Sequence, residues 1–182
     1  KGVDLWVKAI PGILKEFPQA RFRFVGKSLN YSPGLSYVAW IKQYLNAYLD
    51  RIDFVDHVPL HEMPFQYEQV DICVFPSRWE NFPNVCLEAM SAGKAIIASE
   101  HGGMKEMIPD NRYGITLDPF NTKALIGAAC SLLNNIDARI AMGLAARERV
   151  QMEYNQVRVG LEMETIYIDA IAHKQQEILH NR

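Results

Sequence analysis

Two glutamates eight positions apart, Glu80 and Glu88, are the residues of this chain with the clearest capacity for chemistry. Glu80 precedes a turn that contains Pro83 and Asn84, and Glu88 lies in the apolar segment after it, which predicts a helix over residues 84–92. Glu88 is the only charged residue of that segment, and a helix that is apolar on every side is normally buried. A carboxylate buried there must meet hydrogen-bond donors, because leaving it unpaired costs several kcal/mol. The two carboxylates therefore indicate a ligand site around the start of a helix.

Each feature of this segment also has an ordinary structural explanation. The start of a helix presents free N–H groups and a dipole that favour an anion such as phosphate, but Asn84 could simply cap the helix. Glu88 could accept two hydroxyl hydrogen bonds from a ribose, or it could pair with an arginine or an amide of the protein. Glu80 could be an exposed loop acid. Gly102 and Gly103 could bring the backbone close to a ligand, or they could permit a tight turn.

The elements that must position these residues alternate between strand and helix patterns. Strands are expected at 21–25, 51–55, 71–75, 94–99 and 114–117, and helices at 3–17 (with a kink at Pro11), 35–49, 61–68, 84–92, 103–108, 122–134, 137–153 and 156–180, with a loop at 28–34. Such alternation predicts an α/β fold in which a parallel sheet is covered by helices on both faces. Ligands bind beyond the carboxyl ends of such strands, which is where Glu80 and the turn follow strand 71–75. The last helix is long enough to reach beyond this domain.

Length and composition narrow the class of protein. A chain of 182 residues fits one domain. Its net charge of −2 does not provide the positive potential that attracts nucleic acid. The three cysteines lack metal-ligand spacing, and we interpret them as reduced, small apolar residues of a cytoplasmic protein. No apolar run approaches the roughly 18 residues that span a bilayer, and the histidines show no spacing for a metal or a catalytic triad. No G-x-G-x-x-G follows a strand, which disfavours a dinucleotide dehydrogenase.

The segment from Pro76 to Ser99, PSRWENFPNVCLEAMSAGKAIIAS, followed by GGMKEMI at 102–108, resembles the signature of the family-4 retaining glycosyltransferases. These are nucleotide-sugar-dependent enzymes of the GT-B fold, and two glutamates separated by seven residues are their hallmark. The likeness extends to the opening KGVD at 1–4, to 17–26, and to 110–119. It implies the Rossmann-like C-terminal half of a GT-B fold.

The same resemblance implies how the chain is organised. Residues 1–182 would form a single nucleotide-sugar-binding domain, with an α/β core over about 1–153 and a C-terminal helix over about 156–182. The N-terminal acceptor domain, and a strand before Lys1, would lie outside this chain. The helical start Lys1-Gly2-Val3, without Met, agrees with a fragment of a longer protein.

Roles for individual residues follow from the resemblance. Glu80 would lie near the transferred sugar as the catalytic residue, and Glu88 would bind the nucleotide ribose. The donor diphosphate would lie on the backbone of the turn Phe82, Pro83, Asn84 and Val85. Pro83 stands where many relatives carry glycine and has no N–H, so Asn84 and Val85 are the better donors.

Two further positions complete the implied site. Lys1 would neutralise the diphosphate leaving group, and the loop at His57 and Val58 would meet the base. Asp56 stands where relatives often have glycine, which leaves the contacts to the base open.

The implied activity is transfer of a sugar, with retention at the anomeric carbon, from a nucleotide-diphosphate sugar to a sugar, lipid or other acceptor held with the missing domain. No metal or other cofactor is expected. We expect the isolated chain to be inactive, and peripheral membrane association of the full-length protein stays open. Two alternatives compete with this interpretation. One is a nucleotide-sugar epimerase of the same fold, and the other is a non-catalytic interaction module that has kept the fold.

Overall fold

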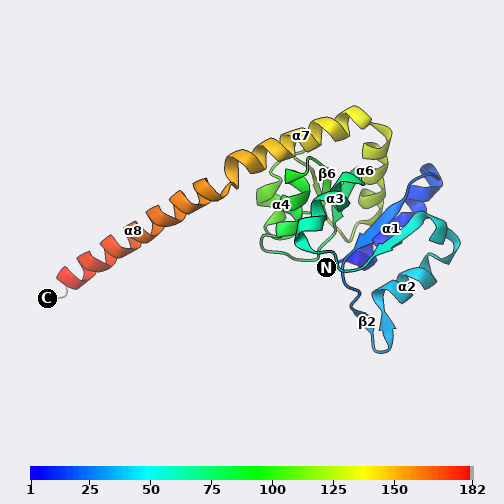
Figure 1. The fold of residues 1–182 in the computed structure, drawn as a ribbon, viewed down its shortest axis with the longest axis horizontal. Coiled ribbons are helices and arrows are strands. Elements are labelled where there is room, and N and C mark those ends of the chain that lie inside the picture. The colour runs from blue at the N-terminus through cyan, green and yellow to red at the C-terminus, as the bar shows by residue number, and fades with distance from the viewer. Residues whose placement is uncertain (181–182) are drawn as a thin grey trace.

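The computed structural model describes residues 1–180, which form an α/β core and one long helix that leaves it (Figure 1). The helices are α1 (Val3–Glu16), α2 (Tyr37–Tyr44), α3 (Met63–Glu68), α4 (Asn84–Ser91), α5 (Met104–Met107), α6 (Thr122–Asn134), α7 (Ile136–Glu153) and α8 (Gln156–His180), with 3-10 segments η1 (Asn46–Arg51) and η2 (Leu60–Glu62). The strands are β1 (Phe22–Val25), β2 (Asn30–Ser32), β3 (Leu35–Ser36), β4 (Ile52–Val55), β5 (Ile72–Phe75), β6 (Ala95–Ser99) and β7 (Ile115–Leu117).

Strand β6 lies at the centre of the core because every one of its side chains is buried. Side chains alternate between the two faces of a strand, so a strand covered on both sides reads as a continuous apolar run. Ala95 and Ile97 pack into one core with α1 and α6, whereas Ile96 and Ala98 pack into a second core with α4 and α5. The expected α/β fold with helices on both faces of parallel strands is therefore confirmed.

The parallel strands form two groups, where the sequence predicted one sheet. Strands β5, β6 and β7 pair in parallel in that order, and β1 pairs in parallel with β4. Within residues 1–180, no hydrogen-bonded ladder joins the two groups. A cavity of about 1020 Å³ is lined by residues of both β1 and β5.

The region around residues 28–49 differs from the expectation of a loop followed by one long helix. Residues 30–36 form the antiparallel hairpin β2–β3, and helix α2 begins only at Tyr37, after Ser36, whose hydroxyl accepts a hydrogen bond from the N–H of Ala39. The rings of Tyr31 and Trp40 stack with centroids 4.5 Å apart, so the hairpin packs on α2. Beyond Tyr44 the chain tightens into η1, which ends the α-helix earlier than predicted. Helix α1, in contrast, continues through Pro11 to Glu16.

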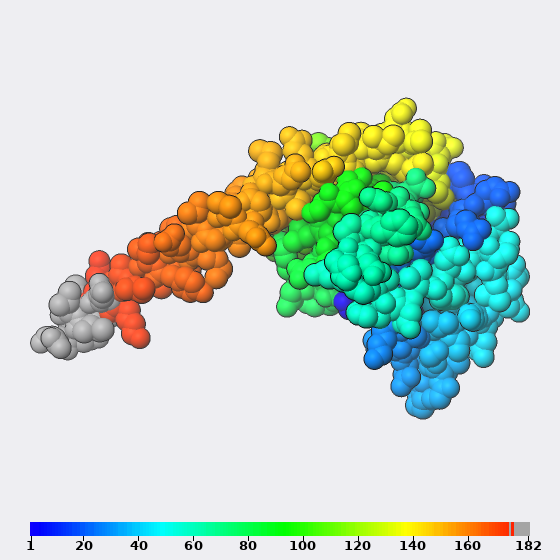
Figure 2. Space-filling model, in the orientation of Figure 1, coloured from blue at the N-terminus to red at the C-terminus, as the bar shows by residue number. Residues whose placement is uncertain are grey.

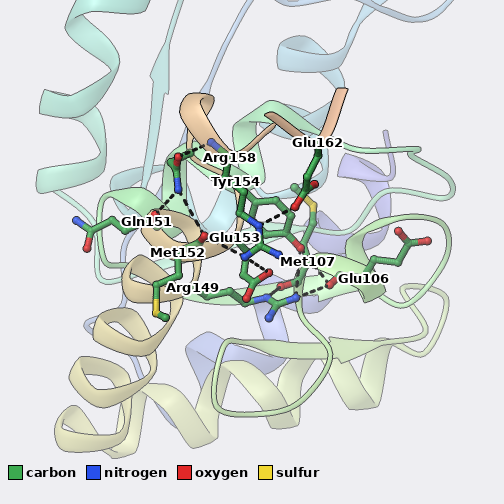
Figure 3. A network of polar contacts seen from close by, with 10 residues as sticks. Glu106, Met107, Arg149, Gln151, Met152, Glu153, Tyr154, Arg158 and Glu162 are labelled. Atoms are coloured by element: carbon green, nitrogen blue, oxygen red, sulfur yellow. Dashed lines mark hydrogen bonds and ion pairs between the residues drawn. The ribbon is translucent and has the colours of Figure 1, made fainter. Parts of the chain in front are cut away.

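A network of polar contacts joins α5 to the end of α7 (Figure 3). The guanidinium of Arg149 donates hydrogen bonds to the carbonyls of Met107 and Glu106, at 3.0 and 3.2 Å, and these are carbonyls that the short helix cannot satisfy itself. Arg149 also donates to the hydroxyl of Tyr154. At the start of α8, Arg158 pairs with Glu153 and Glu162. This network fixes α5 and the end of α7.

Helix α8 then extends away from the core, as Figures 1 and 2 show. Every α8 residue whose burial is described is exposed. None of the described helices is both long enough and apolar enough to span a membrane.

Candidate nucleotide-sugar site

Glu80 and Lys1 meet at the carboxyl end of β5. The Lys1 Nζ lies 3.1 Å from the Glu80 Oε1, and the Glu80 side chain is only 24% exposed. The backbone of Glu80 is held from the other side, because the N–H of Gly103 donates to its carbonyl at 2.9 Å. Gly102 has φ +82°, and a Cβ there would overlap with the same carbonyl. At Gly102 the structure shows a tight turn that lets the backbone approach Glu80.

The N-terminus of α4 is open. Pro83 occupies the N-cap position and no side chain caps the helix, so the capping that Asn84 could have supplied is not formed. Among the described residues, the N–H groups of Asn84 and Val85 have no acceptor. Pro83 is buried, and the half-exposed ring of Phe82 packs edge-on against Tyr154 with centroids 5.5 Å apart. Two backbone donors therefore stand free at the positive end of a helix dipole.

Glu88 has a hydrogen-bond donor that sequence reasoning missed. The hydroxyl of Tyr67, on α3, donates to the Glu88 Oε2 at 3.0 Å. Burial, the hydrogen bond to Glu88 and the Glu88 charge together raise the pKa of Tyr67 far above its ordinary value, so the phenol stays protonated. Nothing in the spacing reveals this pair, because Tyr67 lies 21 positions away on another element.

The expectation that α4 is buried on all sides is wrong. Val85 is 41% exposed and Glu88 is half-buried, because the first turn of α4 borders open space. The Glu88 Oε1 has no donor among the described residues. One carboxylate oxygen is thus held by Tyr67 and the other is free to accept.

The 1020 Å³ cavity gathers part of the expected site. It is lined by Lys1, Glu80, Pro83, Val85 and Tyr67. Phe82, Asn84 and Glu88 adjoin these residues on the same turn and helix but are not among its lining. The structure thus brings the two glutamates, the turn and Lys1 into one region.

His57 and Val58 lie apart, in the segment after β4. His57 is exposed, and its N–H donates to the Asp56 carboxylate at 2.8 Å. Within residues 1–180, no hydrogen bond or ion pair joins either residue to Glu80 or Glu88, and neither residue lines the cavity. Within residues 1–180, no cluster of three or more His, Cys, Asp or Glu side chains could hold a metal ion.

Comparison with known proteins identifies the family. Residues 1–135 match the family model described as "Glycosyl transferases group 1". Spore coat protein SA of Bacillus subtilis (strain 168) is 28% identical over 170 residues, which cover 92% of this chain and 45% of that protein. The chain spans less than half the length of the curated relatives with which it aligns first.

Solved structures show the same fold. The C-terminal domain of a group 1 glycosyltransferase, LpcC of Francisella tularensis, superposes with a TM-score of 0.73 at 22% identity, covering 86% of this chain and 80% of that one. HepE of Anabaena, in complex with UDP, superposes with a TM-score of 0.83 at 19% identity, covering 93% of this chain and 45% of that one. With three-quarters or so of its length matched by the family model, the chain belongs to the group 1 glycosyltransferases, and it has the fold of a C-terminal GT-B domain.

Proposed function

We propose that this chain is the donor-binding domain of a retaining glycosyltransferase, which transfers a sugar from a nucleotide-diphosphate sugar to an acceptor. The observation that carries the proposal is the meeting of three groups in one region. These are the Lys1–Glu80 pair, the two free N–H groups of α4, and the Glu88 carboxylate with one open oxygen. A cation, an open helix N-terminus and a carboxylate match the diphosphate and ribose of a nucleotide donor.

The free N–H groups of Asn84 and Val85 would receive the diphosphate. As the bond between the sugar and the diphosphate breaks, negative charge grows on the departing oxygens. Fixed N–H groups and the Lys1 ammonium stabilise that charge without having to reorient. In this mechanism the protein supplies electrostatic stabilisation of the leaving group and needs no resident cofactor.

The two glutamates would act on different parts of the donor. The open Glu88 Oε1 accepts from the ribose hydroxyls, while Tyr67 keeps the other oxygen in place. Glu80, next to Lys1, orients hydroxyls of the sugar at the reacting carbon. His57 and Val58 would meet the base through the segment after β4. The acceptor would be held with a further domain of the full-length protein, which leaves this chain alone without transferase activity.

Thermal unfolding in the presence of UDP, GDP and ADP tests the proposal directly. A ligand at about 100 times its dissociation constant should stabilise the domain by roughly 2.7 kcal/mol. We expect one of the three to do so, and we expect Glu88→Ala to abolish the shift. Glu162→Ala is the matched control, because Glu162 is an exposed carboxylate on α8 that pairs with Arg158.

Two results would contradict the assignment. If Glu88→Ala kept the full shift, Glu88 would not bind the ribose. If no nucleotide shifted the wild-type chain or the full-length protein, the donor-binding role itself would be wrong.

A further inference from the structure

The first turn of α1 and the segment that carries Glu80 face each other along a seam of three contacts. Lys1 pairs with Glu80, Gly2 lies against the carbonyl of Pro76, and Asp4 pairs with Arg78. Gly2 has φ +70°, and a Cβ at this position would overlap with the Pro76 carbonyl. The backbones therefore touch at one point, and side chains join them on either side of it.

The Asp4–Arg78 pair is the most buried of these side-chain contacts. The Arg78 Nη2 lies 2.7 Å from the Asp4 Oδ2, and the Asp4 side chain is only 11% exposed. The other carboxylate oxygen, Oδ1, has no partner among the described residues. Arg78 is thus the one recorded side-chain partner of this carboxylate, and separating the two would leave a buried charge unpaired.

Arg78 also contacts an aromatic ring. Its guanidinium lies 5.8 Å from the centroid of the Phe120 ring, in the segment between β7 and α6. It is therefore held between a buried carboxylate and an aromatic face, although its side chain is 47% exposed. An arginine fixed in this way fixes the segment of backbone to which it belongs.

We propose that Asp4 is a positioning residue, which acts through Arg78 to hold residues 76–83 against the first turn of α1 and so keeps Lys1 in the region of the candidate site. The Lys1 side chain is itself 75% exposed, so burial contributes little to holding it in place. The part of this inference that concerns ligand rests on the proposed function, since Lys1 would there neutralise a diphosphate.

The test compares a nucleoside diphosphate with its monophosphate, using whichever of UDP, GDP and ADP the chain binds. Asp4→Asn should weaken diphosphate binding about tenfold, which corresponds to about 1.4 kcal/mol, while monophosphate affinity changes less than about twofold. Loss of stability alone would not change the ratio of the two affinities. Arg78→Gln, at the exposed end of the pair, should reproduce the effect if Asp4→Asn does not fold. Arg78→Lys keeps the positive charge and should therefore retain part of the diphosphate affinity that Arg78→Gln loses.

Asp110→Asn is the matched control, because Asp110 also pairs with arginine, 2.9 Å from Arg112, but does not line the cavity that holds Lys1 and Glu80. Hydrogen exchange supplies a readout that needs no ligand. Amides of residues 78–82 should exchange faster in Asp4→Asn and at the wild-type rate in Asp110→Asn.

The two readouts separate failure of the inference from failure of the proposed function. If wild-type protein bound no nucleotide, the proposed function would fail and hydrogen exchange would decide on the seam. Unchanged exchange at 78–82, or equal loss of diphosphate and monophosphate binding, would overturn the positioning role of Asp4.

Discussion

At the scale of single residues, the Glu80 carboxylate already pairs with the cation that the proposed ligand would need. The Lys1 ammonium pairs with Glu80 at 3.1 Å, so a bound diphosphate would have to compete for it. Removing the Glu80 charge should then change diphosphate binding and sugar transfer in opposite directions. Without donor the carboxylate pairs with Lys1, and with donor bound it would orient the sugar.

Glu80→Gln tests this competition. The amide frees Lys1, so affinity for the nucleoside diphosphate should not fall and should rise by a factor of two to five, the range expected from a partly exposed ion pair of up to about 1 kcal/mol. Sugar transfer by the full-length enzyme should fall by about 100-fold, since a hydrogen bond at the reacting centre is lost. Calorimetric titration and a transfer assay measure the two effects. A tenfold loss of diphosphate affinity would instead mean that the carboxylate itself binds the ligand.

Two buried thiols give a prediction about pH. Burial raises the pKa of Cys73 to about 12 and that of Cys86 to about 12, against 9.0 for a free thiol. Between pH 9 and pH 12, each of these thiols has lost its proton in the unfolded chain and still holds it in the folded chain. The free energy of unfolding therefore falls as pH rises from about 9 towards 12. Each thiol contributes a slope of about −1.4 kcal/mol per pH unit to the free energy of unfolding.

Urea unfolding with reductant, at pH values from 8 to 10.5, measures that slope. Cys86→Ala should make it shallower by up to one proton, whatever its effect on stability at pH 7. The difference between the two proteins isolates the thiol from the lysines and tyrosines that titrate in the same range. Equal slopes would show that Cys86 ionises in the folded chain as it does in the unfolded one.

At the scale of elements, the sequence predicts best where one pattern dominates. Strand β6 and helix α4 were placed to within two residues, because a continuous apolar run between turn residues has few other interpretations. The hairpin β2–β3 was missed, since its exposed strand Asn30–Ser32 shows no apolar alternation and packs through the stack of Tyr31 on Trp40.

The candidate site shows the same division. The two glutamates and the turn could be predicted from their positions along one strand, turn and helix. Tyr67 and Arg78 could not, because each pairs with a residue 21 or 74 positions away, and only the folded chain brings them together. The resemblance supplied a role for Lys1 that spacing alone could not, and for the turn it favoured a diphosphate over simple capping by Asn84.

Replacement by alanine should have opposite effects on stability at two helical glycines. A Cβ at Gly143 on α7 would overlap with the backbone carbonyl of Gly93, before β6, whereas nothing lies within 4 Å of a Cβ at Gly127 on α6. Alanine favours a helix over glycine by about 1 kcal/mol. Gly127→Ala should therefore stabilise the domain by about 0.5–1 kcal/mol. Gly143→Ala should destabilise it by about 1–3 kcal/mol, because α7 must shift away from the core.

Denaturant midpoints of the two variants decide the matter, with Gly127→Ala as the internal control for helix propensity. Stabilisation by both alanines would mean that α7 does not pack as closely on the segment before β6 as the structure shows.

At the scale of the whole molecule, the two groups of strands face each other across the cavity between β1 and β5. Lys1, at the start of α1, is among the residues that line it. The strand expected before Lys1 stays a prediction. In the described residues β1 pairs only with β4 and β5 pairs only with β6, so each has one edge with which such a strand could pair. The division of the sheet is thus a property of the described residues that the alternation of strands and helices could not reveal.

Helix α8 is the other feature of the whole molecule that packing within the chain does not explain. Its exposed apolar side chains include Val157 at 74%, Leu161 at 59%, Ile166 at 63% and Ile168 at 59%. At its start, Arg158 pairs with Glu153 and donates a hydrogen bond to the carbonyl of Met152, both on α7. A helix held at one end draws little stability from tertiary contacts, and helices without such contacts are marginal in water.

Deleting residues 156–182 should therefore leave the core intact. We expect the thermal midpoint to move by less than about 3 °C, which for a chain of this size corresponds to about 1 kcal/mol. The deletion should also reduce self-association at high concentration, because a large exposed apolar surface promotes it. Replacing Leu161 and Ile168 by Gln keeps the chain length and should reproduce the change in association alone. Light scattering and calorimetry measure the two effects, and a midpoint lowered by 10 °C or more would show that α8 packs on the core.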